Sequence, residues 1–396
     1  MGRLDADLDD ELDARLAAVD LHLRHRYPGD PGGRQPVHTV YVPADRWHAG
    51  LLPAWGAAAL DALKAAPALP YDEALHARVT AKLAREPIED LRIDFEDGYG
   101  IRADDEEDAA AEAAAKALSV AEAVPPFVGV RVKSMESHTR RRSLRTLDGF
   151  LDVWFSEDRV RLPDNFVVTL PKVSDPAQVA AFAMVCGRLE VAYGIPAGGL
   201  RFEIQIETPP AILATDGTAT VARMITAADG RCTGLHYGTY DYSAAAGIGA
   251  AYQSMDHPAA DHAKAVMQVA AAGTGVRLSD GSTNILPVGT DAQVAAAWAL
   301  HARLVRRSLE RGFYQGWDLH AAQLPTRYAA TYAFFRDGAA AAHDRLAAYL
   351  DRRDTGILDE PATARALAGF LLRGLRCGAL DAADVGDFTE DRLTRL

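Results

Sequence analysis

Short strand-like stretches alternate with helical patterns along most of the chain, and this alternation is the strongest constraint on its fold. The segments between the strand-like stretches carry apolar residues at helical spacing, and no hairpin turn joins two consecutive stretches. Strands separated by helices form parallel sheets, and eight such units favour an α/β fold that closes into a (β/α)8 TIM barrel. The expected strands are residues 37–43, 90–98, 126–133, 165–172, 201–207, 234–242, 275–279 and 316–320.

A doubly wound open sheet is the alternative architecture. It fits less well, because no glycine-rich phosphate turn follows the first strand. The 396 residues exceed the ~250 that one barrel commonly takes, so we expect flanking segments. The expected parts are an N-terminal helix and linker (1–33), a catalytic barrel (34–336) with an insertion at about 134–163, and a helical C-terminal extension (337–396).

Charge and cysteine content limit the partners and the environment of the protein. The net charge is −13 and no basic face is evident, which argues against nucleic-acid and anionic-membrane partners. No apolar run is long enough to span a membrane, and the acidic N-terminus does not resemble a signal peptide. The three cysteines are far apart and match no disulfide or metal spacing. We therefore expect a cytoplasmic protein.

Two acidic residues at the ends of consecutive expected strands suggest a metal site. Glu207 ends the fifth strand, and Asp241 lies at the end of the sixth. Carboxyl ends of barrel strands face one mouth, so the two carboxylates can converge on a single hard cation. Zinc is disfavoured because no Cys or His lies at ligand spacing. The pair suits Mg²⁺, which keeps water ligands and takes others from a substrate.

Basic residues at other strand ends extend this candidate site. Arg131 is suited to bidentate binding of a carboxylate, and Lys172 to acting as a point charge. A metal ion and an arginine can stabilise an enolate formed by proton loss or carbon–carbon cleavage beside a carbonyl. Lys172 also fits Schiff-base formation, although that chemistry does not need the acid pair.

The remaining strand-end residues at this mouth are Glu96, Asp97, Lys133, His320 and Gln323. Each of them alone is equally compatible with a structural ion pair or a cap, so it is the whole set that indicates a site.

Five motifs between about residues 90 and 245 suggest a relationship to known enzymes. They are Asp94-Phe95-Glu96-Asp97-Gly98, Val130-Arg131-Val132-Lys133, Leu170-Pro171-Lys172-Val173, Ile206-Glu207-Thr208 and Gly238-Thr239-Tyr240-Asp241-Tyr242-Ser243. Their order and spacing resemble the citrate lyase β-subunit-like superfamily, which includes the HpcH/HpaI aldolases and malyl-CoA lyases. The last three motifs also resemble malate synthase. Residues 316–323 resemble the family's Gly…His-Pro…Gln run, with Ala321 where proline is expected.

The resemblance implies a Mg²⁺-dependent barrel lyase, aldolase or condensing enzyme acting on an organic acid, a 2-oxo acid or an acyl thioester through an enolate. The site residues carried over with it are Glu207 and Asp241 for the metal (Mn²⁺ being an alternative ion), Arg131 and Lys172 for catalysis, and Arg131, Glu96, Asp97 and Lys133 for substrate binding. Lys133 stands where the family usually has asparagine, so the oxygen-binding pocket would differ.

A C-terminal segment adds one further candidate. Residues 356–361 resemble a segment that, in these lyases, reaches a neighbouring subunit and supplies an aspartate. The resemblance therefore implies that Asp359 is a general acid or base and that the protein is a homo-oligomer, a trimer or a hexamer, although a monomer with the arm folded back is also compatible with the sequence. The same Asp-Glu-Pro sequence is also an ordinary start for the helix that follows.

Other interpretations stay open at this stage. A cluster of arginines could bind a CoA phosphate, although a solvated helix face is the simpler interpretation; the cluster is Arg140, Arg141, Arg142 and Arg145. The same metal–enolate chemistry would serve a phosphoenolpyruvate-type substrate, and a non-catalytic scaffold barrel would tolerate substitution at every strand end.

Overall fold

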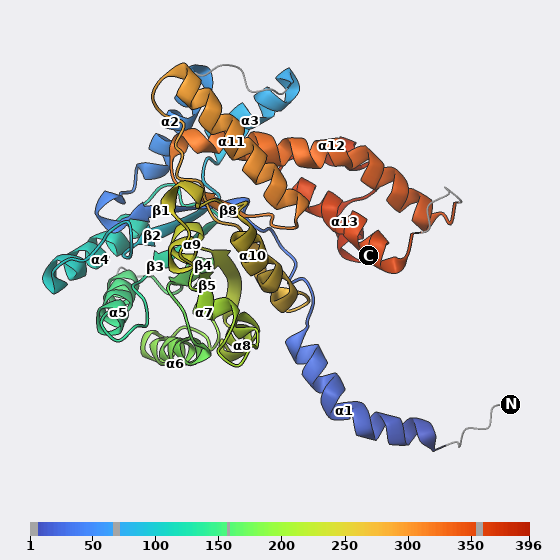
Figure 1. Cartoon of the computed structure of the whole chain (residues 1–396), viewed down its shortest axis with the longest axis horizontal. Coiled ribbons are helices and arrows are strands. Elements are labelled where there is room, and N and C mark those ends of the chain that lie inside the picture. The colour runs from blue at the N-terminus through green and yellow to red at the C-terminus, as the bar shows by residue number, and fades with distance from the viewer. Residues whose placement is uncertain (1–6, 66–71, 157–158, 354–358) are drawn as a thin grey trace.

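Eight parallel strands form the barrel in the computed structural model, which describes residues 7–65, 72–156, 159–353 and 359–396 (Figure 1). Their order is β7-β6-β5-β4-β3-β2-β1-β8. A parallel bridge between Ser279 and Gln315, with a 2.8 Å hydrogen bond from Asp280 N–H to the Gln315 carbonyl, joins β7 to the start of β8. The predicted TIM barrel is thus confirmed. The strands are β1 (His38–Pro43), β2 (Asp90–Asp94), β3 (Phe127–Arg131), β4 (Phe166–Leu170), β5 (Arg201–Ile206), β6 (Cys232–Tyr237), β7 (Arg277–Ser279) and β8 (Gly316–Asp318).

Helices cover the outside of this barrel and also form its end segments. They are α1 (Leu8–Arg26), α2 (Leu51–Ala65), α3 (Glu73–Arg85), α4 (Asp104–Ser119), α5 (Arg140–Ser156), α6 (Pro176–Tyr193), α7 (Pro209–Ile212), α8 (Thr220–Ala227), α9 (Thr239–Ala245), α10 (Pro258–Ala271), α11 (Asp291–Glu310), α12 (Leu324–Leu350), α13 (Pro361–Arg376), α14 (Ala382–Val385) and α15 (Glu390–Thr394), with 3-10 turns at Ala44–Arg46, Ala250–Tyr252 and Ala321–Gln323. The predicted insertion contains α5, which packs against α4 and α6 as the helix of the third βα unit.

Strand β6 is shorter than the sequence predicts. The prediction that it runs to Tyr242 is wrong, because the strand ends at Tyr237 and α9 begins at Thr239. Asp241 lies in the first turn of α9, where a negative side chain is stabilised by the helix dipole. Asp241 therefore reaches the barrel mouth from a short helix.

Paired charges fill the half of the barrel interior that is nearer the amino ends of the strands. Arg92 donates hydrogen bonds to Asp90 and, at 3.0 and 2.9 Å, to the two carboxylate oxygens of Glu203. His236 Nε2 lies 2.9 Å from Glu203 Oε2. All four side chains are buried, and such groups are tolerated only when each has a partner. His236 is thus a packed strand histidine.

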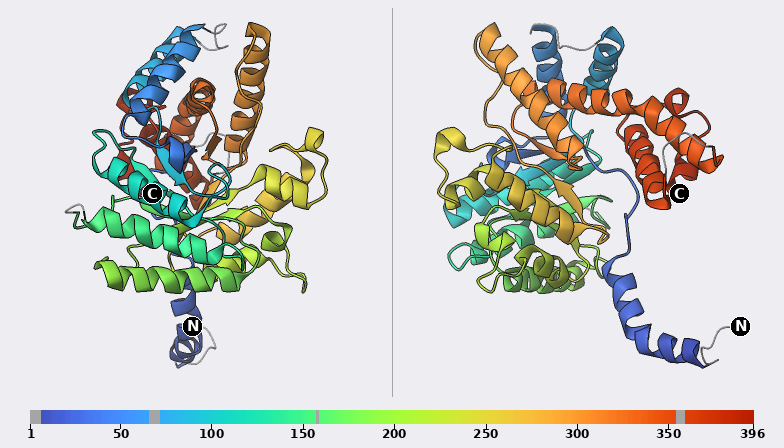
Figure 2. Two further views of the ribbon diagram at one scale, coloured as in Figure 1. Left: turned by 90° about the vertical axis from the view of Figure 1, so that its left-hand side faces the viewer. Right: turned by 45° about the vertical axis from the view of Figure 1, so that its right-hand side comes forward.

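The C-terminal extension begins with a helix shared with the barrel. Helix α12 runs without a break through the predicted boundary at residue 337 and packs on α2, α3 and α11. Helix α13 packs back against α12, and Arg376 near its end donates a 2.8 Å hydrogen bond to the carbonyl of Gly33, just ahead of β1. The extension therefore lies toward the amino ends of the strands (Figure 2).

The N-terminal helix α1 projects away from the barrel, and none of its residues is buried (Figure 1). Over the part of the chain that the structure describes, no helix is long and apolar enough to cross a membrane.

Candidate active site

Lys172 follows β4 and connects several strand ends at the barrel mouth. Its backbone N–H donates a 2.7 Å hydrogen bond to Glu207 Oε1. Its Nζ lies 2.8 Å from Glu96 Oε1, 3.0 Å from Asp97 Oδ1 and 3.6 Å from Asp241 Oδ2. Burial by itself lowers the pKa of Lys172, but the surrounding carboxylates, Glu207 and Glu96 foremost, raise that pKa well above its ordinary value. The ammonium therefore stays charged at neutral pH, which argues against the Schiff-base alternative.

Glu207 is deeply buried at this mouth, with only 2% of its surface exposed. Burial raises the pKa of its carboxyl to about 8, and nearby Glu96 and Asp241 act in the same direction, whereas Lys172 opposes them. Gly238 makes room for this side chain, because a Cβ at that position would lie 2.4 Å from the Glu207 Cβ. Glu207 is thus a carboxyl poised near neutrality, held in a pocket that only glycine permits.

Asp241 completes the predicted pair but lies in a different environment. About half of its side chain is exposed, and its Oδ2 shares the Lys172 ammonium with the Glu96 and Asp97 carboxylates. The pair thus consists of one buried and one exposed carboxylate on either side of a lysine.

Arg131 is buried at the end of β3, and part of its hydrogen-bonding capacity is already used. Its Nε and Nη2 donate to the two oxygens of Asp94 at 2.6 and 2.7 Å. The guanidinium lies 4.7 Å from the centre of the Tyr41 ring. The predicted bidentate binding of a substrate carboxylate cannot use this edge, because Asp94 occupies it. The third nitrogen, Nη1, lies 3.4 Å from both Gln205 Oε1 and Glu96 Oε2, and is the atom that faces the mouth acids.

The pKa values of the two acids after β2 are shifted in opposite directions. Burial raises the pKa of Glu96, and its neighbour Asp97 adds to the effect, whereas Arg131 and Lys172 oppose it. Asp97 is half exposed; burial by itself raises its pKa, but Arg131 and Lys172 lower it below the ordinary value. The predicted acids of the second strand therefore join Arg131 and Lys172 in one cluster.

This cluster has more acids than bases. The carboxylates are Asp94, Glu96, Asp97, Glu207 and Asp241, and the cations are Arg131 and Lys172. An excess of oxygen donors with negative charge is the ligand chemistry that Mg²⁺ prefers. In the described residues, no three His, Cys, Asp or Glu side chains are already arranged around one point. The donor set therefore fits a cation held by Glu207 and Asp241 with its other positions open to water and substrate.

Comparisons with known proteins place the chain in a family. The sequence profile described as "Domain of unknown function (DUF6986)" matches residues 16–396. The chain belongs to the DUF6986 family. No curated protein matches its sequence.

Solved structures resemble the DUF6986 chain in fold. A citrate lyase from Burkholderia xenovorans LB400 is 20% identical with a TM-score of 0.62, and the alignment covers 89% of this chain and 97% of that one. CitE from Mycobacterium tuberculosis, in complex with magnesium, acetoacetate and coenzyme A, is 20% identical with a TM-score of 0.53, and the alignment covers 87% and 99% of the two chains. The predicted resemblance to citrate lyases is thus confirmed at the level of the fold.

The geometry does not support a substrate contact for Lys133. Its ammonium donates to the carbonyls of Phe95 (2.6 Å) and Gly100 (3.1 Å) and to Glu107 Oε2 (2.7 Å). An ammonium has three hydrogens, and these acceptors use all of them. Lys133 instead fixes the loop between β2 and α4, which carries Glu96 and Asp97.

Asp359 does not join the other site residues within one chain. It forms an ion pair with Arg345 of α12 at 2.6 Å, in the extension beside the amino ends of the strands. The site residues lie at the opposite, carboxyl ends of the strands. A contribution of Asp359 to a neighbouring subunit's mouth stays a prediction.

The remaining candidates have structural partners. Arg142 and Arg145 pair with Asp108 of α4, so these two arginines join α5 to α4; Arg142 is largely covered, unlike a residue on a solvated helix face. His320 Nδ1 accepts the Ala322 N–H at 3.1 Å, and Gln323 accepts the Leu319 N–H at 2.8 Å.

Sequence reasoning missed Asp94 and Gln205, which both contact Arg131. Period-two alternation along β2 and β5 points them into the barrel, together with Arg92 and Glu203, and this signal could have found them. Gln205 Nε2 is buried and has no hydrogen-bond partner among the residues that the structure describes, so it is a donor available beside Arg131 Nη1.

Proposed function

We propose that this protein is a divalent-cation-dependent lyase or aldolase that cleaves or forms a carbon–carbon bond beside the carbonyl of a small organic acid. The observation that carries the proposal is the convergence of the buried carboxyl of Glu207, the exposed carboxylate of Asp241 and the buried guanidinium of Arg131 around Lys172. The raised pKa of the Glu207 carboxyl, about 8, beside several other charged groups at the strand ends supports a functional site.

Each residue has a role that follows from its position. Arg131 Nη1 and the free Gln205 amide offer hydrogen bonds to a substrate oxygen from one side. Lys172 supplies a fixed positive charge on the other side. A cation held by Glu207 and Asp241 would supply Lewis-acid stabilisation of the negative charge that develops on the carbonyl oxygen. Asp94 keeps the Arg131 side chain in one orientation through its two short hydrogen bonds.

The relatives in fold support the substrate class. The CitE structure contains magnesium, acetoacetate and coenzyme A, which supports a metal ion, an oxo acid and a thioester carrier as candidate ligands for a barrel of this fold. We propose a carboxylic or 2-oxo acid as the substrate, either free or as a CoA thioester. We further propose that Asp359 of a neighbouring subunit acts as the general acid or base, which requires a homo-oligomer.

Calorimetric titration with Mg²⁺, alone and with pyruvate, oxaloacetate or glyoxylate, tests the proposal. We expect wild-type protein to bind the ion, to bind it more tightly with one of the acids, and to lose binding in Glu207→Gln. Glu310→Gln removes an exposed acid at the end of α11, on the side where the chain enters β8, and is the matched control. If wild type binds neither ion nor acid, the strand-end acids are structural and the scaffold alternative holds.

A further inference from the structure

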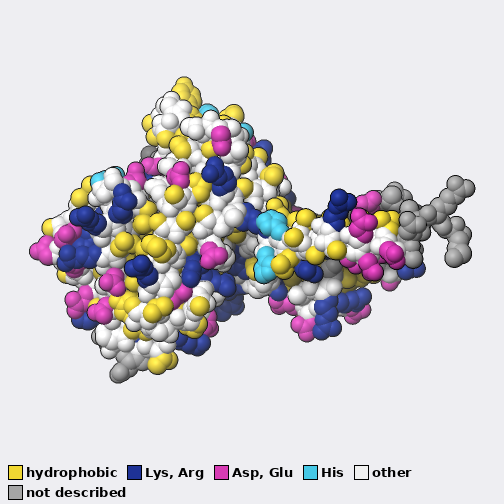
Figure 3. Space-filling view, turned by 90° about the horizontal axis from the view of Figure 1, so that it is seen from below, with side chains coloured by type: hydrophobic (Ala, Val, Ile, Leu, Met, Phe, Trp, Pro, Cys, Tyr) yellow, Lys and Arg dark blue, Asp and Glu magenta, His cyan; other side chains and the backbone are white. Residues whose placement is uncertain are grey.

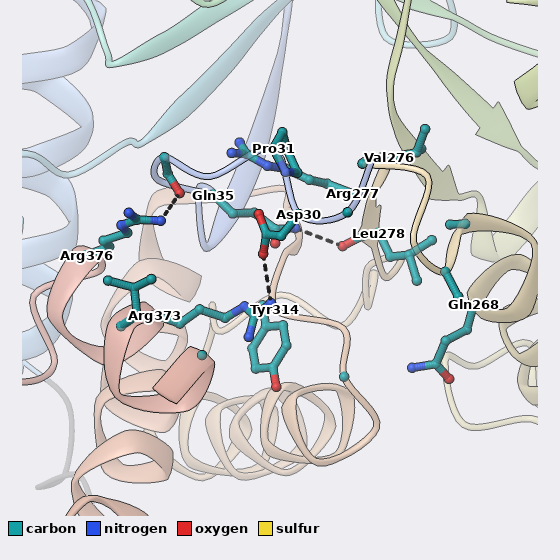
Figure 4. Close-up of a pocket in the computed structure, with 18 of the residues that line it drawn as sticks. Asp30, Pro31, Gln35, Gln268, Val276, Arg277, Leu278, Tyr314, Arg373 and Arg376 are labelled. Carbon is teal, nitrogen blue, oxygen red and sulfur yellow. Dashed lines mark hydrogen bonds and ion pairs between the residues drawn. The ribbon is translucent and has the colours of Figure 1, made fainter. Parts of the chain in front are cut away.

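A second cavity lies at the opposite end of the barrel from the candidate active site. Its volume is about 330 Å³, and it is enclosed by the linker ahead of β1, the loop between α10 and β7, and α13 (Figure 4). Besides the C-terminal helices, the segments that line it precede β1, β7 and β8, so the cavity lies at the amino ends of the strands. None of the residues assigned to the candidate active site lines it.

Three arginines from two distant parts of the sequence line this cavity. Arg277 begins β7, and Arg373 and Arg376 belong to the last turn of α13. Burial lowers the pKa of Arg277, Asp30 opposes this effect, and the positive charges of Arg376 and Arg373 lower the pKa further, so the three arginines are close enough to affect one another. Repulsion between such like charges destabilises the folded protein unless an anion neutralises them.

The acids near these arginines neutralise them only in part. Arg277 donates to the carbonyls of Arg34 (2.7 Å) and Gly32 (2.8 Å), and it has no carboxylate within ion-pair distance in the described parts of the chain. Asp30 reaches Arg373 at 3.4 Å and is two-thirds exposed. Arg376 pairs with Glu390, which is also mostly in solvent. The cavity is therefore a positive site within a chain whose net charge is −13.

Most of the remaining lining is apolar and includes an aromatic ring, with Gln35 and Gln268 as polar exceptions. Tyr314 lies under the Arg373 guanidinium at 4.6 Å, and the other apolar residues are Val276, Leu278, Phe335 and Leu372. Figure 4 shows Arg373, Asp30 and Tyr314 grouped on one side of the cavity, with Arg277 and Gln35 above them. A pocket that is apolar over most of its surface, with a few charged groups at one end, is typical of small-molecule sites.

We propose that this cavity binds a small phosphate monoester, with its phosphate among Arg277, Arg373 and Arg376 and its apolar or planar body against the apolar lining formed by Val276, Leu278 and Leu372. A phosphate fits better than a carboxylate, because it offers three acceptor oxygens to guanidinium groups that approach from different elements. The volume of the cavity is at the lower end of the range for ligand pockets, roughly 300–1,000 Å³, so the ligand is small. This site is independent of the lyase function proposed above.

Calorimetry of the full-length protein with AMP tests this site, with inorganic phosphate and adenosine as partial probes. We expect AMP to bind, and each partial probe to bind more weakly. Arg373→Gln should weaken AMP binding about tenfold, since it removes one charged hydrogen-bonding group. Arg303→Gln, which removes an exposed arginine of α11 paired with Asp256, should leave binding unchanged.

Asp30→Asn gives an effect of opposite sign that a folding defect cannot mimic. It removes the carboxylate that competes for Arg373 but keeps the oxygen that accepts the Gly32 N–H, so AMP should bind several-fold more tightly. The proposal is overturned if AMP does not bind, if Arg373→Gln has no effect, or if Asp30→Asn weakens binding. Citrate binding without AMP binding would overturn the phosphate assignment. Glu207→Gln should retain AMP binding, so failure of the lyase proposal leaves this test intact.

Discussion

The backbone N–H of Lys172 donates a 2.7 Å hydrogen bond to Glu207, while the same residue adopts a left-handed conformation with φ of 51°. A non-glycine residue in that region is strained by about 1 kcal/mol or more, and such strain gathers at functional sites. One residue thus holds the buried carboxyl with its backbone and the more exposed acids Glu96 and Asp97 with its ammonium. Lys172 therefore connects the buried and the exposed acids of the mouth.

Replacing Lys172 with methionine should separate catalysis from metal binding. The ammonium competes with a cation for Asp241, so we expect Lys172→Met to bind Mg²⁺ at least as tightly as wild type in calorimetry. Turnover of an identified substrate should fall roughly 100-fold, because a positioned charge is lost. Lys64→Met removes an exposed lysine of α2 and should change neither quantity. Weaker Mg²⁺ binding in Lys172→Met would show that the Lys172 ammonium does not compete with the cation for Asp241.

Glu207 should make the metal-free protein less stable as the pH rises. Its folded-state pKa of about 8 exceeds the ordinary 4.5, so the folded state binds more protons than the unfolded state between these values. The stabilisation is present below pH 4.5 and is lost as the pH rises through 8. Glu207→Gln lacks this titration and should exceed wild type in free energy of unfolding by a few kcal/mol at pH 9, with almost no difference near pH 4.5.

Urea unfolding in EDTA at several pH values measures this difference, with Glu112→Gln on the exposed face of α4 as control. Adding Mg²⁺ at pH 8 should reverse the order, because the ion stabilises only wild type. A difference between the two proteins that does not change with pH would contradict the assignment of this pKa.

Gly238 should be intolerant of alanine. The added methyl would lie 2.4 Å from the Glu207 Cβ, so one of the two backbones must shift. We expect Gly238→Ala to lose about 2 kcal/mol of unfolding free energy and its Mg²⁺ binding. Gly149→Ala in α5 meets no atom within 4 Å and should stabilise the protein by about 0.5–1 kcal/mol. Equal thermal unfolding of both variants would show that Gly238 is not needed for packing.

Asp359 should act on a neighbouring subunit if it acts at all, since it lies in the extension paired with Arg345. Glu207→Gln and Asp359→Asn proteins should each be inactive alone. Co-refolding them in equal amounts should restore about a quarter of the sites, because one site then takes both intact residues from different chains. The readout is turnover together with the oligomer mass by light scattering. Full activity of Asp359→Asn alone would remove this residue from the mechanism.

The amino-acid sequence by itself determined the barrel and the location of the candidate site. The change between strand and helix periodicity is local, and eight repeats without hairpins leave few alternatives to a closed parallel barrel. Because all parallel strands end at one mouth, Glu96, Arg131, Lys172 and Glu207 could be grouped before any contact was known.

Only the tertiary structure decided which of these groups pair with one another. Whether Arg131 binds Asp94 or a substrate, and whether Lys133 holds a loop or lines a pocket, depends on atomic distances of a few ångströms that strand periodicity does not specify. The same holds for the second cavity, where Arg277 and Arg373 are brought together from parts of the chain almost 100 residues apart. Local pattern sets secondary structure and direction, whereas long-range packing sets the partners, and charge and protonation follow from those partners.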